Sequence, residues 1–316
     1  MRQRLGYRII SVFHAGARMT KKLIKKFAVK RLIRKIKKSL TPQSLSLWQV
    51  QWQWRRRDPR EWPSARLSGG EGINRYEYSL FSQHGEDGII RYLLSEVGIA
   101  SRTFVEFGFG VVQNNSLRLI LNEDFQGLFI DGSEESCSLF NRSAERLRLE
   151  NVFAISRFLN VDNMQEIIRR GVSSGEIDFL SIDVDGNDYW FWEKIDCISP
   201  RIVCIEYNAG FGPDWSVTVA YDPDFRRFHK HPSGFYHGCS ISALDKLGVK
   251  KGYRLVGCDS SGTNAFFLRT DITAPDVPTL LPSVAFRPHQ NWLGRGFSQE
   301  EQLEILESIP QLYVEI

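Results

Sequence analysis

The sequence has few cysteines, no long apolar run and an N-terminal segment that lacks acidic residues. Its five cysteines are scattered over 316 residues and form no CxxC pair, so a disulfide framework or a zinc knuckle is not expected. No apolar stretch reaches the roughly 18 residues of a transmembrane helix. The apolar stretch 9–13 is also too short for a secretory signal. We therefore expect a protein of a reducing, cytoplasmic compartment.

Charge is distributed unevenly along the chain. Residues 1–40 contain fourteen of the 41 basic residues and none of the 37 acidic ones, which leaves 27 basic and 37 acidic residues for the remainder. The body of the protein is thus acidic, and this argues against nucleic acid as its partner. An anionic partner would instead be bound by the basic N-terminal segment.

The basic segment has the pattern of an amphipathic helix. Apolar residues recur at every fourth position from 24 to 40, and Lys or Arg fills most of the other faces. Such a helix, followed by Trp48, Trp52 and Trp54, suits an anionic membrane surface. We predict peripheral binding to the inner face of a membrane through residues 20–56. A solvated basic arm, or a contact with another anionic partner, is the alternative, and Met19 is an alternative start to Met1.

Beyond this segment the sequence predicts one α/β domain. From residue 76 onward, short apolar stretches alternate with helical segments, which predicts a mostly parallel sheet with helices on both faces. A Pro-, Gly- and Ser-rich linker precedes this pattern. The predicted divisions are an N-terminal extension at 1–56, the linker at 57–75, the domain at 76–272 and a C-terminal extension with a packed helix at 273–316.

The individual elements follow from the same alternation. We expect strands at 103–107, 127–131, 151–156, 178–183 and 201–207, with helices from about 114 and at 134–150, 162–170 and 188–195. A polar loop then leads to a helix at 240–252 that is closed by a glycine. An antiparallel hairpin at 253–259 and 264–269 follows at the sheet edge. The last helix begins at Ser298 with a capping box to Glu301.

Polar residues at the ends of the first two predicted strands are the first site candidates, because ligands bind at the carboxyl ends of an open parallel sheet. Glu106 is followed by Gly108 and Gly110, which allow the backbone to approach a ligand closely. No third glycine completes a pyrophosphate fingerprint, so the pattern favours a cofactor with a cationic amino group, or else a plain tight turn. Asp131 is placed to accept hydrogen bonds from both hydroxyls of a ribose, or to cap the next helix.

Carboxylates also gather after the fourth and fifth strands. Asp183, Asp185 and Asp188 crowd one strand end, and such groups repel one another unless a cation or a proton shields them. A divalent metal with oxygen ligands is one solution, and a turn followed by a helix cap is the alternative. Glu206, at the next strand end, is expected to face Asp183 or to form a structural salt bridge.

A loop at 221–239 contains half of the histidines, namely His229, His231 and His237. A histidine on a loop can act as a general base that deprotonates a hydroxyl. We select His237 for this role, with a solvated loop as the alternative.

Several of these segments together resemble the FkbM-type family of S-adenosylmethionine-dependent methyltransferases. They are VEFGFG, GLFIDG, DFLSIDVDGNDYW, VCIEYN and KGYRLVG with TNAFF, and the resemblance covers about residues 78–270. Asp185 stands where the family usually has Glu. The resemblance implies a Rossmann-like seven-stranded sheet, mostly parallel with an antiparallel last strand. It also implies O-methylation of a carbohydrate, a glycolipid or a related hydroxyl.

The resemblance also implies roles for the candidate residues. Glu106, Gly108 and Gly110 would surround the methionine part of the cofactor, Asp131 would bind its ribose, and Asp183 would lie beside the transferred methyl group. Some similar sugar methyltransferases use magnesium, and Asp183, Asp185 and Glu206 match such a site.

Two other functions fit the same residues. A metal-dependent glycosyltransferase would use Asp183 and Asp185 as a DxD pair, although Glu106 and Asp131 would then lack a role. A non-enzymatic interaction protein, bound to a membrane by its basic segment, would keep the fold without the reaction.

Overall fold

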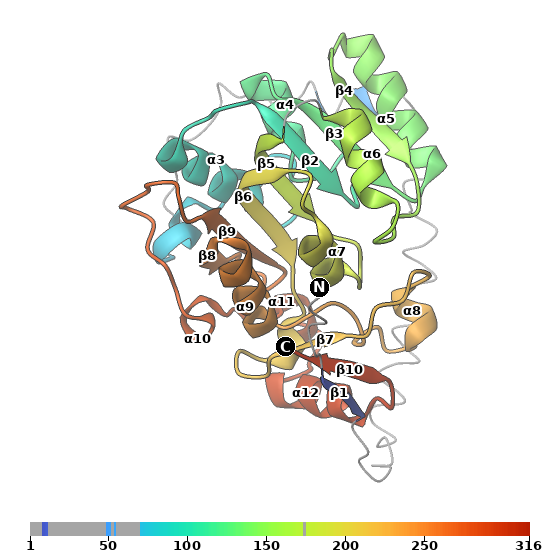
Figure 1. The fold of residues 1–316 in the computed structure, drawn as a ribbon, viewed down its shortest axis with the longest axis vertical. Coiled ribbons are helices and arrows are strands. Elements are labelled where there is room, and N and C mark those ends of the chain that lie inside the picture. The colour runs from blue at the N-terminus through green and yellow to red at the C-terminus, as the bar shows by residue number, and fades with distance from the viewer. Residues whose placement is uncertain (1–7, 12–48, 52–53, 55–69, 173–174) are drawn as a thin grey trace, which may run out of the picture.

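The structure is a computed structural model that describes residues 8–11, 49–51, 54, 70–172 and 175–316. Its main element is a seven-stranded sheet (Figure 1). In this sheet β4, β3, β2, β5 and β6 are parallel to one another, and β9 is antiparallel to its two neighbours, β6 and β8. This confirms the predicted Rossmann-like sheet with its antiparallel last strand. Side by side, the strands are β4 (Val152–Ser156), β3 (Gln126–Asp131), β2 (Thr103–Phe107), β5 (Glu176–Ile182), β6 (Ser199–Glu206), β9 (Asn264–Arg269) and β8 (Tyr253–Cys258).

The order of the strands reverses between β2 and β5. The chain first moves outward from β2 to β3 and β4, and it then returns to place β5 on the other side of β2. At such a switch point the two connections leave the sheet in opposite directions, which opens a crevice at the carboxyl ends of the strands. The crevice here lies beyond the ends of β2 and β5.

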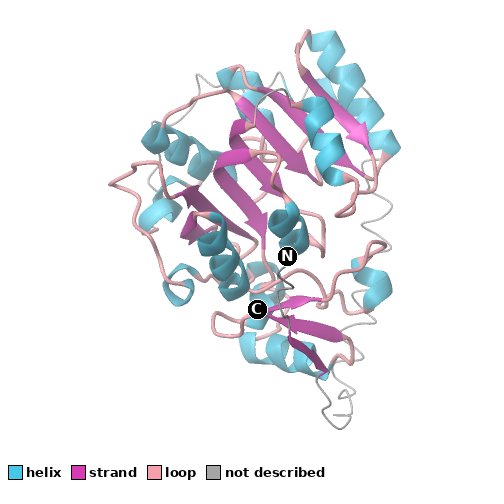
Figure 2. Ribbon diagram, in the orientation of Figure 1, coloured by secondary structure: helices cyan, strands magenta, loops and turns pink. Residues whose placement is uncertain are grey.

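Helices cover both faces of the sheet (Figure 2). Side chains of successive strand residues point to opposite faces, so Phe104 and Val105 of β2 enter two different apolar cores. The core around Phe104 is covered by α3 (Glu86–Val97), α4 (Leu117–Glu123) and α5 (Glu134–Leu147). The core around Val105 is covered by α6 (Met164–Gly171), α7 (Asp188–Lys194) and α9 (Ile241–Lys251).

A second, antiparallel sheet lies beside the main one (Figure 1). Its order is β1 (Arg8–Ser11), β10 (Leu312–Glu315) and β7 (Val217–Val219), and α12 (Gln299–Ser308) shares an apolar core with it. We did not predict this sheet. The segment 208–239 was expected to be a polar loop, but it contains β7, and β1 lies in the N-terminal extension ahead of the predicted amphipathic helix.

Short helices complete the described elements. They are α8 (Arg227–Lys230), α10 (Pro282–Ala285), α11 (Gln290–Leu293) and the 3₁₀ helices Gly72–Tyr76 and Ala209–Phe211. The first 3₁₀ helix lies within the segment that we interpreted as a linker, and it packs against β8. The predicted domain limits as a whole remain predictions.

Several sequence predictions of local structure are confirmed. β8 and β9 form the expected hairpin, and α9 ends at Gly252, whose φ of 82° is in the left-handed region. The capping box is also present, because the Ser298 Oγ accepts from the Glu301 N–H while the Glu301 carboxylate accepts from the Ser298 N–H. Four of the five cysteines are buried and all are free thiols, as expected for scattered cysteines.

The N-terminal extension contributes a buried tryptophan to the domain. Trp54 is 3% exposed, its Nε1 donates to the Val111 carbonyl at 3.1 Å, and its ring centroid lies 5.4 Å from that of Phe140. The prediction that Trp54 contacts a membrane is therefore wrong, because the ring is already buried and hydrogen-bonded. The basic segment 20–48 and Trp52 lie outside the described residues. Within the described ranges, no helix is long and apolar enough to cross a membrane.

Candidate active site

Two loops meet where β2 and β5 end side by side. The Gly108 N–H donates to the Ile130 carbonyl at 2.9 Å, and the Asp183 N–H donates to the Phe107 carbonyl at 3.0 Å. A Cβ added to Gly108 would overlap the carbonyl oxygen of Asp183, and the φ of Gly108 is 70°. Both the close approach and the left-handed backbone require glycine at this position. The predicted tight turn is therefore confirmed.

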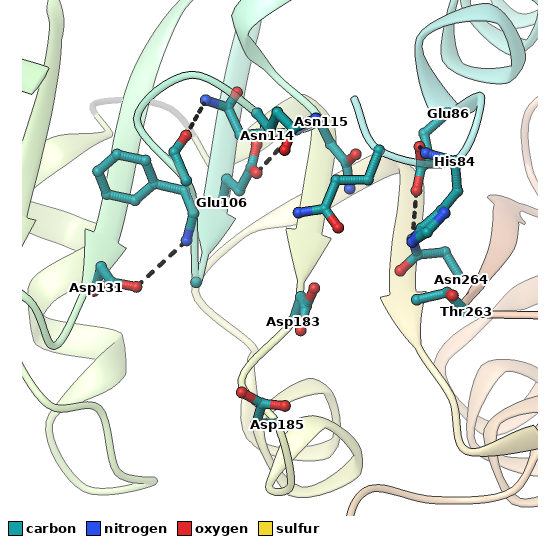
Figure 3. A pocket seen from close by; sticks show the side chains of 15 residues that line it. His84, Glu86, Glu106, Asn114, Asn115, Asp131, Asp183, Asp185, Thr263 and Asn264 are labelled. Atoms are coloured by element: carbon teal, nitrogen blue, oxygen red, sulfur yellow. Dashed lines mark hydrogen bonds between the residues drawn. The ribbon is translucent and has the colours of Figure 1, made fainter. Parts of the chain in front are cut away.

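Two adjoining pockets flank this contact between the loops. The first has a volume of about 270 Å³ and the second about 510 Å³. Gly108, Asp131, Asp183 and Asp185 line both of them. The first pocket extends from Asp131 to the start of β9, and Figure 3 shows it. The second lies on the side of β3 and β4 and includes Phe158 and Arg226.

Glu106 lies at the end of β2 and lines the first pocket. It is 2% exposed, and its Oε1 accepts from the Asn115 N–H at 3.1 Å. Burial raises the pKa of Glu106 to about 7, although hydrogen bonds from Ser116 and Asn115 act in the opposite direction. A carboxyl group in this state exchanges its proton readily for a cationic ligand.

Asp131 lies at the end of β3 and reaches both pockets. Its Oδ1 accepts from the Ser133 N–H at 2.7 Å, and its Oδ2 accepts from the Phe109 N–H at 3.4 Å. The cap of α5 is Ser133, whose hydroxyl accepts from the Ser136 N–H, so Asp131 is not itself the helix cap. Burial raises the pKa of the Asp131 carboxyl. Its position beside the Gly108 turn agrees with the predicted ligand-binding role.

The three aspartates after β5 have different environments. Asp188 is fully buried, and its carboxylate accepts from the Val184 and Gly186 N–H groups at 2.9 Å each. Asp188 therefore stabilises the loop after β5 through hydrogen bonds, which agrees with a structural role rather than with a metal ligand. Asp183 instead opens into the pockets. Its side chain is exposed within the crevice, and partial desolvation there raises its pKa, as do the carboxylates of Asp185 and Asp188.

The proposed magnesium ligands are separated by an arginine. The Nη1 of Arg227, in α8, lies 2.9 Å from Asp185 Oδ1 and 3.6 Å from Glu206 Oε1. This guanidinium pairs with both carboxylates and occupies the position that a metal ion would take between them. Among the described residues, no group of three or more His, Cys, Asp or Glu side chains is arranged to hold a metal. Asp183, Asp185 and Glu206 therefore do not fit a magnesium site. Glu206 instead forms the salt bridge that was the alternative prediction, with Arg227 as its partner.

His237 does not reach the pockets. Its ring is 1% exposed, its Nδ1 lies 3.0 Å from the Phe235 carbonyl and its Nε2 lies 3.8 Å from Glu206 Oε1. Burial lowers its pKa well below the usual range, and the positive charge of Arg227 adds to this effect. Neither His237 nor Glu206 lines either pocket. The structure thus gives no support to His237 as the base, because its loop turns inward and packs beside β6.

Other residues line the pockets without having been predicted. Gln83 and His84 precede α3, and Thr263 and Asn264 lie at the start of β9. Both pairs adjoin regular elements, and the sequence pattern alone does not bring them together. In the second pocket Phe158 is 43% exposed, and the Cζ of Arg226 lies 4.8 Å from its ring centroid. The exposure of this ring on a pocket wall depends on the fold, so the sequence alone did not distinguish Phe158 from the other phenylalanines.

Comparisons with known proteins were made for the whole chain. No protein-family model and no curated protein sequence matches it. Solved structures that resemble it include an O-methyltransferase from Bacillus cereus in complex with S-adenosylhomocysteine, with 16% identity, 69% of this chain and 88% of that chain covered, and a TM-score of 0.39. Another is magnesium protoporphyrin IX methyltransferase from Synechocystis PCC 6803 with bound S-adenosylmethionine, with 12% identity, 58% and 77% covered, and a TM-score of 0.36.

Proposed function

We propose that the protein is an S-adenosylmethionine-dependent methyltransferase that methylates a hydroxyl of a carbohydrate, a glycolipid or a related compound. The observation that carries this proposal is the placement of Asp131 between the two pockets, beside the glycine turn at the switch point. A carboxylate in this position pairs with the two hydroxyls of a ribose. The two sides of the crevice then accommodate the two ends of a nucleoside with a cationic side chain.

The second pocket suits the base of such a nucleoside. Its wall includes the exposed ring of Phe158 and Arg226, whose Cζ lies 4.8 Å from the ring centroid. An exposed aromatic ring stacks against a planar base, and a guanidinium does so as well. We assign the adenine to this pocket.

The first pocket suits the cationic end of the cofactor. Five carboxyl groups contribute to its lining, namely those of Glu86, Glu106, Asp131, Asp183 and Asp185. The amino group and the sulfonium of S-adenosylmethionine are both positive, so these carboxyl groups favour binding. The reaction itself is an in-line displacement at the sulfonium methyl carbon, for which the protein mainly has to align the two reactants.

A phosphate-containing cofactor fits the same crevice poorly. The helix after β2 begins at Leu117, and the Asn114 Oδ1 accepts from the Ser116 and Leu117 N–H groups at 3.2 and 2.7 Å. The amides that a pyrophosphate would contact are therefore already occupied. The carboxyl groups of the pocket would also repel phosphate, and Arg227 takes the place of a shielding metal beside Asp185. These contacts argue against the nucleotide-sugar alternative.

A thermal-shift panel separates the candidate functions. The melting temperature of the full chain would be measured with S-adenosylhomocysteine, with UDP plus manganese, and with neither. Methyl transfer predicts stabilisation by S-adenosylhomocysteine alone, because a ligand that binds only the folded state stabilises it. Stabilisation by UDP plus manganese alone would favour the glycosyltransferase, and no stabilisation by either would favour the interaction protein.

We further propose that the basic segment at residues 20–48 brings the active site to an anionic membrane, where a glycolipid acceptor would be found. The sequence pattern supports this, and Trp54 takes no part because it is buried in the domain. Sedimentation with phosphatidylserine vesicles tests the idea. Binding should be lost when Lys35, Lys37 and Lys38 are replaced by Glu, and should persist when Lys250 and Lys251 on α9 are replaced in the same way.

A further inference from the structure

The loop that precedes α3 is held in place by a buried carboxylate. Asp87 is 1% exposed, and its Oδ2 accepts from three consecutive backbone N–H groups at 2.6 to 2.8 Å. Burial raises the pKa of Asp87, while these hydrogen bonds lower it. Removing such a carboxylate would leave three buried amides unpaired. The three amides belong to Leu80, Phe81 and Ser82.

A second buried carboxylate fixes the two residues that follow. Glu86 is 2% exposed; its Oε2 accepts from the His84 N–H at 2.6 Å, and its Oε1 accepts from the Asn264 Nδ2 at 2.9 Å (Figure 3). The first turn of α3 is thereby tied to β9. Gly85 completes the turn with a φ of 99°. The backbone of His84 is thus fixed from both sides.

This fixed loop presents Gln83 and His84 to the first pocket. Figure 3 shows His84 beside Asn264 and Thr263, with Asp131 at the far end of the pocket and Asp183 between them. The sheet arranges these residues in the same order, because β3, β2, β5, β6 and β9 lie side by side in that order. Within the described residues, the imidazole of His84 makes no hydrogen bond, and it is half-buried.

We propose that the Gln83–His84 loop forms the acceptor side of the active site and that His84 is the base that receives the acceptor proton. This inference rests on the proposed function. If the cofactor extends from Phe158 past Asp131 to Asp183, the space between Asp183 and β9 remains for the acceptor. The hydroxyl oxygen then attacks the methyl carbon from the side opposite to sulfur.

The step balances with these groups alone. The acceptor oxygen forms a bond to the methyl carbon, and the carbon–sulfur bond breaks with its electron pair moving to sulfur. The hydroxyl proton passes to a ring nitrogen of His84 and from there to solvent. S-adenosylhomocysteine and the methyl ether are the products. Histidine is the side chain that most often accepts a proton in this way.

The test compares two cofactor forms that differ in one methyl group and one positive charge. The ring protons of His84 are followed by NMR over a pH titration of the full chain, and their signals are assigned by their loss in His84→Asn. Glu86, Glu106, Asp131, Asp183 and Asp185 line the same pocket, and His289 interacts electrostatically with His84, but all of these groups are present in both complexes. The difference between the S-adenosylmethionine and S-adenosylhomocysteine complexes therefore isolates the sulfonium.

We expect the midpoint of the His84 titration to be lower by at least about 0.5 pH unit in the S-adenosylmethionine complex, since a nearby cation disfavours the imidazolium. The exposed ring of His229 should have the same midpoint in both complexes. If both compounds bind and the midpoints of His84 agree, His84 does not face the methyl group and the inference is wrong, while the proposed function stands. If neither compound binds, the proposed function itself fails, and this inference with it.

A second measurement distinguishes whether His84 acts as the base or binds the cofactor. His84→Ala should bind S-adenosylhomocysteine within about twofold of the wild type, because the acceptor side does not hold the cofactor. A loss of affinity of tenfold or more, with an unchanged melting temperature, would place His84 on the cofactor instead and would overturn the assignment.

Discussion

Gly108 packs directly against the carbonyl oxygen of Asp183, so that the loops after β2 and β5 touch through backbone atoms alone. The contact lies at the switch point of the sheet and separates the two pockets. Gly108, Asp131 and Asp183 line both pockets at this contact.

Gly108→Ala should abolish cofactor binding and destabilise the fold. The added Cβ would overlap a backbone atom, and alanine is strained at a φ of 70°. We expect a loss of about 3 kcal/mol in the free energy of unfolding, from the left-handed backbone and the overlap together. Gly252→Ala is the control, because Gly252 is in the left-handed region with a φ of 82° and a Cβ there would meet no atom closer than 4.0 Å. Denaturant unfolding should give a loss of only about 1 kcal/mol for the control, and equal losses would contradict the role of the contact.

Arg227→Met should reduce stability in a pH-dependent way. Burial raises the pKa of Glu206 well above its usual range, and Arg227 limits that rise. An acid whose pKa is raised on folding binds its proton more tightly in the folded state, so stability falls as the pH rises above the usual pKa of Glu. Without Arg227 this fall should be larger, reaching about 2 kcal/mol at pH 8 and vanishing near pH 4. Urea unfolding at several pH values measures it.

Lys230→Met provides the control for Arg227. Lys230 is in the same short helix and pairs with Asp222 at the surface. An exposed pair of this kind contributes less than about 1 kcal/mol. A loss in Lys230→Met as large as that in Arg227→Met would mean that α8 as a whole, rather than the buried charge of Glu206, is responsible.

Cofactor binding should release a proton from Glu106. Its pKa of about 7 in the free protein means that a substantial fraction is protonated at neutral pH, and a bound ammonium favours the carboxylate. The affinity for S-adenosylhomocysteine should therefore weaken by up to about fivefold between pH 7 and pH 6. Calorimetry in buffers of different ionisation enthalpy measures the released proton. Glu106→Gln should bind more weakly at pH 8 and lose the pH dependence; an unchanged dependence would exclude Glu106 as its source.

Phe158→Ala should weaken binding of the cofactor without affecting the fold. The ring is 43% exposed on the wall of the second pocket, so its removal leaves no cavity in a core. Loss of one stacking partner corresponds to about 1 kcal/mol, or about a fivefold weaker affinity. Phe153→Ala is the control, because Phe153 is 36% exposed on β4 and lines neither pocket. Equal affinities of the two variants would contradict the placement of adenine.

The sequence predicts the main sheet and the middle of the site for the same physical reason. Continuous apolar stretches such as TFVEF and DFLSID form strands that are buried on both faces, and parallel strands bring their carboxyl ends to one edge. Glu106, Asp131 and Asp183 could thus be located from their positions at strand ends. No knowledge of distant contacts was needed for them.

The parts that were missed depend on contacts between distant segments. β7 pairs with β10 across nearly a hundred residues, and this pairing helps to set the path of the segment that carries His237. His84 reaches the pocket because Glu86 is hydrogen-bonded to Asn264, which is 178 residues away in the sequence. Asp185 was predicted to bind a metal, but it pairs with Arg227, which lies on a helix that was not predicted. Local patterns carry no information about such pairs.

Calorimetric titration of the wild-type chain with S-adenosylhomocysteine tests the central claim most directly. The account predicts saturable binding of one molecule per chain, weakened at least about tenfold by Asp131→Asn, since a buried hydrogen bond to a charged group contributes about 1.5 kcal/mol or more. Asp162→Asn, at an exposed aspartate outside both pockets, should bind like the wild type. Absence of binding to the wild type, or equal affinity in Asp131→Asn, would contradict the account.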